Sequence, residues 1–433
     1  MRYVLLASIA SLLVSASEVP PPPELPRYRL ETGRILMYEI RVPGQPDRES
    51  RFEIHVLARN QDKSFRLLFR SESGGRTTLA FADAFPDGRL VSNDTLGVVL
   101  DPRPVFPKLP ANQSELEDGW EVVEPNLGTV YRYRAVAERR GYRLSWTRHR
   151  TIDAIYGTTS EADAFFDPSR RRRVLTRIET KGSRGGESLP RSEAELVRSR
   201  WRSVDEAERL HREAEAYFAA LAEYDETTRD LPFAPADELP QRLQDAEAKL
   251  RELENRLTFD ILRESLRARL PKGPSSARLV ESARRAIEIG SLLGAPAPEF
   301  EATDLEGERH SLSDYRGRVV LLDFWQANCG WCFYAMPKIR QLAETFRNEP
   351  VTVLGMNVDD DRIQDAHRIV SAMKLEYPNL VAKGTREPYR LRALPTLFLI
   401  DREGIVRHIH QGFSPGLADD LSHRIRALLE PAR

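Results

Sequence analysis

Apolar and polar residues alternate in short segments over the first two hundred residues of this 433-residue chain. A period of two is typical of antiparallel strands that bury one face and leave the other in water. Residues 138–141 favour a hairpin turn, and the proline-rich stretch 101–110 predicts a loop, since proline cannot lie in a central strand. We therefore expect a curved sheet or partial barrel, with strands near residues 35–42, 51–58, 64–71, 129–137, 142–149 and 172–180.

The apolar spacing changes to three and four after residue 200, which is typical of helices. Ser203 and Glu206 form a capping-box pattern, so a first helix should begin there and continue to about Glu226. Another helix is expected over residues 277–293, where a glycine and a proline follow. We predict a helical hairpin or short coiled coil that serves as a spacer or dimer arm, with the apolar seam Leu243, Ala246, Leu250, Leu253 and Leu257.

The last 140 residues alternate strand and helix patterns and predict an α/β unit with an antiparallel edge. The whole chain is then a multidomain α+β protein, whose oligomeric state the sequence leaves open. We expect a signal peptide at 1–17, a proline-rich linker at 18–26, an antiparallel β domain at 27–200, a helical spacer at 201–293 and an α/β domain at 294–433. The α/β elements are expected at 319–325, 331–347, 351–358, 362–374, 396–401, 405–412 and 417–429.

The N-terminus has the pattern of a secretory signal. One positive residue precedes an apolar run from Tyr3 to Val14, and small residues follow at 15–17. A buried N-terminal helix is the alternative, and the run is too short to span a bilayer comfortably. We expect an extracytoplasmic protein, periplasmic or secreted, that is tethered only if the signal is not cleaved.

The formal net charge of -1 gives no overall attraction to nucleic acid. From Thr129 to Arg212 there are 20 Lys/Arg against 12 Asp/Glu, so a nucleic-acid or anionic-surface site is one interpretation. Arginines and tyrosines alternate at residues 131–134, however, as they would on a sheet with one solvated face. We favour the solvated face and expect no nucleic-acid partner.

The only two cysteines, Cys329 and Cys332, enclose two residues. Exported proteins often use disulfides as structural links, but so short a loop constrains the unfolded chain very little. The pair follows the apolar strand pattern 319–325 and opens a predicted helix, where free backbone N–H groups and the helix dipole stabilise a thiolate. This placement favours a redox pair.

Residues 293–429 resemble the extracytoplasmic thioredoxin-like family of the TlpA-like and ResA-like kind. The matching residues are 294–332, the Met-Pro pair 336–337 and the segment 393–412, in the family's order. The resemblance implies a thioredoxin fold and a thiol–disulfide oxidoreductase that needs no further cofactor. It also implies disulfide-containing protein clients and a membrane thiol donor as partners.

The resemblance makes Cys329 the nucleophile, Cys332 the resolving thiol and Pro395 a cis-proline that faces them. A cis X–Pro bond forms a fixed turn, so the backbone of Leu394 can pair with an extended client. Asp323 falls where the family carries a buried acid, whose raised pKa would let it exchange a proton with Cys332. The alternative for Asp323 is a partly exposed strand end.

This chain departs from the family pattern around the cysteines. Asn328 and Trp331 stand where the family commonly has tryptophan and proline, and we expect Trp331 to cover the thiols and contact the client. Ala335 stands where TlpA-like members tend to have glutamate, so proton transfer would rest on Asp323. A difference of ~30 mV already corresponds to ~1.4 kcal/mol, so the sequence leaves open whether the pair reduces or oxidises its clients.

Three alternatives remain at this point. In the first, the β region is a binding scaffold that recruits partners, with the thioredoxin-like part as a docking module. Peroxidases share the fold, but they normally have threonine three residues before the nucleophilic cysteine. That position is Gln326 in this chain. Zinc needs four ligands, whereas His408 and His410 alternate on a predicted strand and are expected on its solvated side, so we predict no metal site.

Overall fold

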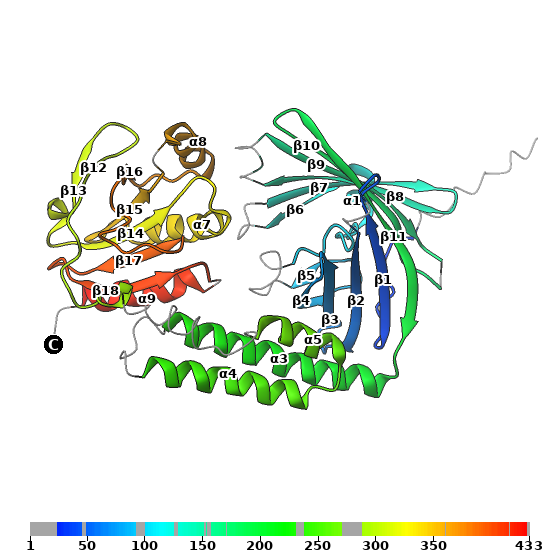
Figure 1. Cartoon of the computed structure of the whole chain (residues 1–433). Coiled ribbons are helices and arrows are strands. Elements are labelled where there is room, and N and C mark those ends of the chain that lie inside the picture. Colours follow the sequence, from blue (N-terminus) through cyan, green and yellow to red (C-terminus); the bar gives the residue numbers. More distant parts are fainter. Residues whose placement is uncertain are drawn as a thin grey trace, which may run out of the picture.

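The computed structural model describes residues 24–45, 49–91, 100–124, 129–150, 153, 157–169, 171–230, 238–270, 288–359, 361–414 and 416–430. The predicted signal peptide and most of the helix expected at 277–293 lie outside these ranges. The described residues form a large β sheet, a layer of helices and a smaller α/β unit (Figure 1). In this part of the chain, no helix combines the length and the apolar character needed to cross a membrane.

The large sheet has eleven strands, and every neighbouring pair is antiparallel. The strand order is β5-β4-β3-β2-β1-β11-β10-β9-β8-β7-β6, so β5 and β6 are the two ends of the sheet. This confirms the predicted antiparallel sheet, and Figure 1 shows its strong curvature. The strands are β1 Arg34–Arg41, β2 Ser50–Arg59, β3 Phe65–Ser73, β4 Arg76–Ala84, β5 Leu90–Val91, β6 Trp120–Glu124, β7 Thr129–Glu138, β8 Gly141–Arg150, β9 Thr158–Asp167, β10 Val174–Arg184 and β11 Glu187–Trp201, with helix α1 at Gln113–Asp118 before β6.

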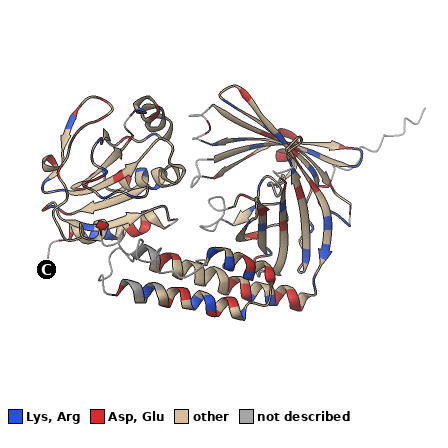
Figure 2. Cartoon of the chain, in the orientation of Figure 1, with Lys and Arg blue, Asp and Glu red and all other residues tan. Residues whose placement is uncertain are grey.

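One face of this sheet surrounds an aromatic core. Tyr28 stacks on Phe106 with ring centroids 4.2 Å apart, and strands from both halves of the sheet contribute to the same cluster. On β7, Tyr131 and Tyr133 point into this core, whereas the arginines that alternate with them are exposed. This agrees with the predicted solvated face, and Figure 2 shows both signs of charge intermingled over the sheet.

Strands β2 to β4 differ from the prediction because both of their faces are buried. Leu57, Leu68 and Phe81 point away from the aromatic core and pack against Leu210 and Leu262 of the helical segment. The helices that contact the sheet are α3 Val204–Asp230 and α5 Asp260–Arg269, and α4 Leu239–Arg256 packs against both of them. The expectation of a wet face is therefore wrong for these three strands, because the helices cover it (Figure 1).

The first of these helices begins as predicted. The N–H of Glu206 donates to Ser203 Oγ at 3.2 Å, and the N–H of Ser203 donates to the Glu206 carboxylate at 3.2 Å. Helix α5 was not predicted, and the described residues do not test the spacer or dimer-arm role.

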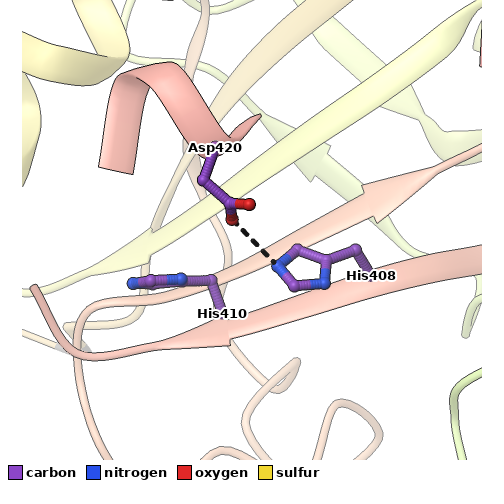
Figure 3. Close-up of side chains that lie close together, drawn as sticks. All are labelled: His408, His410 and Asp420. Carbon is purple, nitrogen blue, oxygen red and sulfur yellow. Dashed lines mark ion pairs between the residues drawn. The ribbon is translucent and has the colours of Figure 1, made fainter. Parts of the chain in front are cut away.

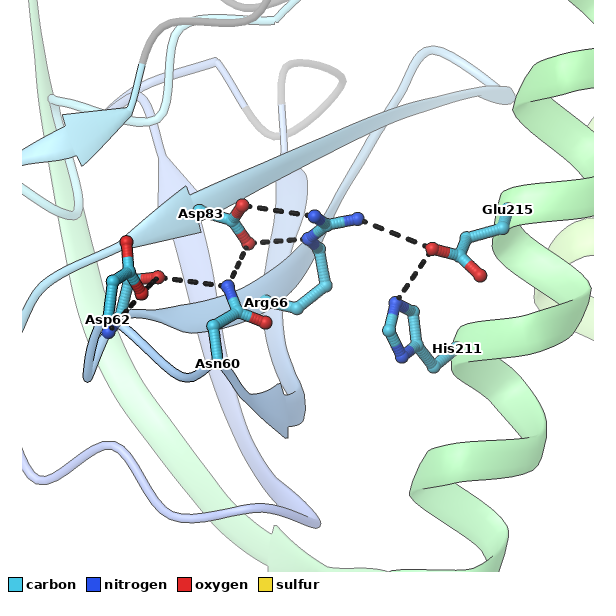
Figure 4. A network of polar contacts seen from close by, with 7 residues as sticks. Asn60, Asp62, Arg66, Asp83, His211 and Glu215 are labelled. Atoms are coloured by element: carbon cyan, nitrogen blue, oxygen red, sulfur yellow. Dashed lines mark hydrogen bonds and ion pairs between the residues drawn. The ribbon is translucent and has the colours of Figure 1, made fainter.

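Polar contacts also tie α3 to the sheet (Figure 4). The guanidinium of Arg66 on β3 donates a hydrogen bond to the carboxylate of Asp83 on β4. Its Nη1 lies 3.6 Å from the carboxylate of Glu215 on α3. Asn60 donates to Asp83 at 2.8 Å, and His211 lies 3.3 Å from Glu215. The helix is therefore held on the sheet by charge pairs as well as by apolar packing.

The C-terminal unit is built on a five-stranded sheet of order β16-β15-β14-β17-β18. β14, β15 and β16 are parallel, and β17 and β18 form the expected antiparallel edge. Helices α7, α8 and α9 pack on one face, and residues of segments 289–312 and 389–391 cover the other. The elements are β12 Glu301–Thr303, β13 Arg309–Ser311, the 3-10 helix η4 Leu312–Tyr315, β14 Val319–Trp325, α7 Gly330–Thr345, β15 Val351–Asn357, α8 Ile363–Met373, β16 Asn379–Val381, β17 Thr396–Ile400, β18 Val406–Gln411 and α9 Leu417–Leu429.

Candidate active site

The two cysteines lie where β14 gives way to α7. Cys329 is the N-cap residue of α7, and its sulfur accepts the N–H of Cys332 at 3.2 Å. The two sulfurs form a disulfide of 2.08 Å, with Cα atoms 5.3 Å apart. Cys329 is 9% exposed and Cys332 only 1%, so Cys329 is the more accessible sulfur of the pair.

The helix start favours a thiolate at Cys329 when the pair is reduced. The first backbone N–H groups of a helix have no partner within the helix, and the dipole adds partial positive charge there. The N–H of Cys332 already points at the Cys329 sulfur, and it would do the same for a thiolate. Gly330, which follows Cys329, faces open space, since an added Cβ would meet nothing within 4 Å.

Asp323 lies in the middle of β14 and is 1% exposed, so the alternative of an exposed strand end is wrong. It shares a sheet face with Leu321 and Trp325, which belong to the same core cluster as both cysteines. Neither of its carboxylate oxygens has a hydrogen-bond partner among the described residues. Burial therefore raises its pKa to about 7.

Pro395 begins the return to the sheet, and the Leu394–Pro395 peptide bond is cis as the resemblance implied. The carbonyl of Pro395 accepts the N–H of Gly412 at 2.7 Å, which links this turn to the end of β18. Thr396 Oγ1 donates to the carbonyl of Ala393 at 2.8 Å and closes the turn from the other side. Leu394 is half-buried at the tip of this turn.

Aromatic rings surround the exposed Trp331, which has 49% of its surface in water. Phe413 stacks on it with centroids 6.4 Å apart, and Tyr334 lies 5.8 Å from Trp331 and 5.9 Å from Phe413. Neither Tyr334 nor Phe413 was predicted as a site residue from the sequence. The spacing of three from Trp331 to Tyr334 on a helix was the available signal for Tyr334.

The loop before the cysteines is fixed by polar contacts. Gln326 donates to Asn328 Oδ1 at 2.6 Å and accepts from Arg386 at 2.5 Å. The N–H of Ala327 donates to Asp359 at 2.6 Å, just beyond β15. Gln326 stands at the position where peroxidases have threonine, and its side-chain amide is hydrogen-bonded to Asn328 and Arg386.

His408 and His410 differ from the prediction. They share one side of β18, but they are 9% and 2% exposed because α9 covers them. Burial lowers the pKa of His408 to about 4, and the nearby Arg424 adds to the effect. The expectation of a solvated side is therefore wrong, and it was one of the two reasons for predicting no metal site.

The C-terminal unit is the part of the chain that resembles the known proteins described next. The model of the AhpC/TSA family matches residues 293–409. The thiol-disulfide oxidoreductase ResA of Geobacillus kaustophilus (strain HTA426) is 34% identical over 122 residues, which are 28% of this chain and 70% of that protein. The thioredoxin-like protein YneN of Bacillus subtilis (strain 168) is 29% identical over 127 residues, 29% of this chain and 75% of that protein.

A solved structure is also similar. The thioredoxin domain of a thiol-disulfide oxidoreductase from Bacteroides vulgatus is 26% identical, with a TM-score of 0.29. The alignment covers 32% of this chain and 98% of that domain. The family match extends from residue 293 to residue 409, so it does not include the large β sheet or helices α3 to α5.

Proposed function

Since this chain belongs, through its C-terminal third, to the thioredoxin-like thiol–disulfide oxidoreductases, we propose that Cys329 and Cys332 exchange disulfides with protein clients outside the cytoplasm. The observation that carries the proposal is the placement of the pair. An isolated disulfide at the N-terminus of α7 joins a more accessible to a buried sulfur. That arrangement suits attack at one sulfur and release by the other.

In the reducing direction the Cys329 thiolate attacks one sulfur of a client disulfide. A bond forms between Cys329 and that sulfur, the client S–S bond breaks, and the second client sulfur leaves as a thiolate that takes up a proton. Cys332 then attacks Cys329, the mixed disulfide breaks, and the client leaves as a dithiol. Two electrons pass to the client, and the pair becomes the Cys329–Cys332 disulfide.

Asp323 is the proton acceptor in this scheme. The buried Cys332 thiol must lose its proton before it can attack, and Asp323 lies on the sheet face that packs in the same cluster. With a pKa of about 7, the carboxyl can take a proton near neutral pH and return it in the reverse direction. Ala335 stands where TlpA-like members tend to have glutamate. It is buried, and its methyl side chain cannot accept a proton.

The client would lie along Trp331, Leu394 and Pro395. Trp331 offers an exposed ring, and the turn at Leu394 offers backbone groups at the edge of the site. A membrane thiol donor would return electrons to the oxidised pair, and the N-terminal segment 1–17 would direct export. N-terminal sequencing of the mature protein tests the export step, since cleavage after residue 17 or nearby is expected.

Insulin reduction with dithiothreitol as electron source tests the activity. The wild-type protein should accelerate reduction, and Cys329→Ser should be as slow as the uncatalysed reaction. Cys332→Ala should accumulate a mixed disulfide with the client on non-reducing gels. The double variant Cys329→Ser/Cys332→Ala is the matched control and should accumulate none. Equal rates for wild type and Cys329→Ser would overturn the proposal.

Equilibration of the pair with a glutathione buffer measures its reduction potential and so shows whether the protein reduces or oxidises its clients. A reduction potential near that of thioredoxin would identify a reductant, and one near the oxidising end of the family range would identify an oxidant.

One cavity favours a second role, client recruitment by the β sheet. A groove of about 680 Å³ lies on the polar face of β6 to β10, where Arg132, Glu161, Asp163 and Lys181 line it. Charged side chains of both signs suit a polar protein surface. Lys181→Glu should then weaken client capture by Cys332→Ala without changing reduction of a small-molecule disulfide. Unchanged capture would exclude this groove.

A further inference from the structure

A second group of chemically reactive side chains lies apart from the cysteines in the chain, where α9 crosses β18. His408 and His410 come from the strand and Asp420 comes from the first turns of the helix. Figure 3 shows the Asp420 carboxylate lying over the two imidazole rings. One ligand atom from each of the three residues lies within 4.8 Å of the other two.

The fold explains why these residues meet. Residues two apart on a strand point to the same side, so both imidazoles face the helix layer. Leu417 and Leu421 anchor α9 in the core of this unit and fix its first turns above β18. Asp420 is therefore carried to the histidines by the packing of its own helix.

The distances are close to those that a metal ion requires. Zinc binds imidazole nitrogen and carboxylate oxygen at ~2.0–2.2 Å, so tetrahedral ligand atoms lie about 3.4 Å apart. His408 Nε2 is already 3.7 Å from Asp420 Oδ2. Asp420 is 41% exposed, so a small movement of its side chain can close the remaining gap.

The surroundings also suit an ion. The guanidinium of Arg424 donates to Asp420 Oδ1 at 2.9 Å, and the other oxygen, Oδ2, faces His408. Such a partner holds a ligating carboxylate in orientation. The histidines are buried and the aspartate is partly exposed, so the site has a dry floor and one side open to water.

We propose that His408, His410 and Asp420 bind one divalent transition-metal ion of the Zn²⁺ class, with water completing the coordination. Two imidazoles and one carboxylate suit Zn²⁺, Co²⁺, Ni²⁺ or Cu²⁺, whereas Mg²⁺ and Ca²⁺ prefer oxygen ligands. The ion would join the edge strand of the sheet to the C-terminal helix. It would therefore stabilise this unit by binding its folded state.

Calorimetric titration of ZnCl2 into the full-length, tag-free protein tests this proposal. The protein is kept oxidised, because the Cys329–Cys332 disulfide then offers no thiolate ligand. One equivalent of Zn²⁺ should bind, Mg²⁺ should not, and Zn²⁺ should raise the melting temperature. Co²⁺ should give the visible absorption of a tetrahedral site.

Matched variants separate the site from surface binding. His410→Gln and Asp420→Asn should weaken Zn²⁺ binding by about tenfold or more. The controls His423→Gln and Asp419→Asn change exposed residues of the same helix and should bind as the wild type does. Asp420→Asn alters a partly exposed residue and keeps the test valid if His410→Gln fails to fold. Equal affinity in all four variants, or no binding by the wild type, would overturn the proposal. Insulin reduction does not enter this readout, so either hypothesis can fail alone.

Discussion

Asp323 on β14 lies directly opposite Gly355 on β15. Gly355 brings no side chain to the carboxyl group, and Leu397 lies opposite Asp323 on the other neighbouring strand. The carboxyl is therefore buried with a glycine opposite it on one side and an apolar side chain on the other, and burial raises its pKa to about 7. Burial is thus the physical cause of the high proton affinity of Asp323.

The raised pKa makes the stability of this unit depend on pH. Between pH 4 and 7 an Asp323 carboxyl keeps its proton in the folded state but has lost it in the unfolded state. The free energy of unfolding should therefore fall with rising pH, by ~1.4 kcal/mol per pH unit and by about 4 kcal/mol in all. Asp323→Asn removes this dependence, because an amide does not titrate. Hydrogen exchange of β14 and β15 amides measures the effect in the intact chain.

The difference between wild type and Asp323→Asn isolates the one carboxyl from all other titrating groups. At pH 4.5 the two proteins should differ little, and at pH 7.5 the variant should be the more stable. Asp419→Asn, which changes an exposed acid of α9, is the control and should follow the wild-type profile. Parallel profiles for wild type and Asp323→Asn would show that the buried carboxyl has an ordinary pKa.

Asp323→Asn should also slow the resolving step. Without a proton acceptor beside it, Cys332 loses its proton to water, and general acid–base catalysis is worth 10²–10⁴-fold in typical cases. We expect about a tenfold to hundredfold slower release of the mixed disulfide near pH 7. Stopped-flow measurement of Cys329–Cys332 disulfide formation separates this step from the first attack. The defect should shrink at high pH, where hydroxide removes the proton, and a pH-independent defect would indicate a structural cause.

The cysteine site was largely predictable because its signals are local. The apolar run 319–325 predicted a buried strand, and the cysteines directly after it predicted a helix start, both of which the structure shows. Asp323 interrupts that run, so its burial followed from the strand. The Leu394–Pro395 turn followed from the family resemblance.

The burial of other side chains depends on helices from other parts of the chain, which a local sequence pattern cannot reveal. A period of two put His408 and His410 on one side of β18, but only the packing of α9 decides that this side is covered. The second buried face of β2 to β4 likewise depends on helices that follow much later in the chain. Phe413 reaches Trp331 through the tertiary fold alone, since the two residues are far apart in sequence.

Trp331→Ala should weaken client binding more than it slows the chemistry. The exposed ring gives a client apolar area and a stacking surface, whereas the sulfurs and Asp323 are unchanged. We expect KM for insulin to rise by about threefold to tenfold, with kcat nearly constant. Trp201→Ala, which removes an equally exposed ring at the end of β11, is the control. A fall in kcat at constant KM would assign Trp331 a role in the reaction itself.

Gly355→Ala should destabilise the C-terminal unit. An added Cβ would lie 2.1 Å from Asn379 Oδ1, and the Asn379 amide is held by a 2.7 Å bond to the carbonyl of Tyr377. Overpacking of this kind costs about 1–3 kcal/mol. Gly416→Ala is the control, since its Cβ would meet nothing within 4 Å. Hydrogen exchange of β15 reports the change, and equal protection in both variants would mean that Asn379 moves aside without cost.

Leu262→Ala tests whether the helices are part of the β domain or a separate spacer. Leu262 is fully buried on α5, in the cluster that covers the outer face of β2 to β4. Truncation of a buried leucine costs about 2–5 kcal/mol, because apolar contacts are lost and a cavity remains. If helices and sheet unfold together, hydrogen exchange should accelerate in β2 to β4 as well as in α5. Leu189→Ala, at an exposed position on β11, is the control and should change neither. Faster exchange in α5 alone would show that the helices open independently of the sheet, as a spacer would.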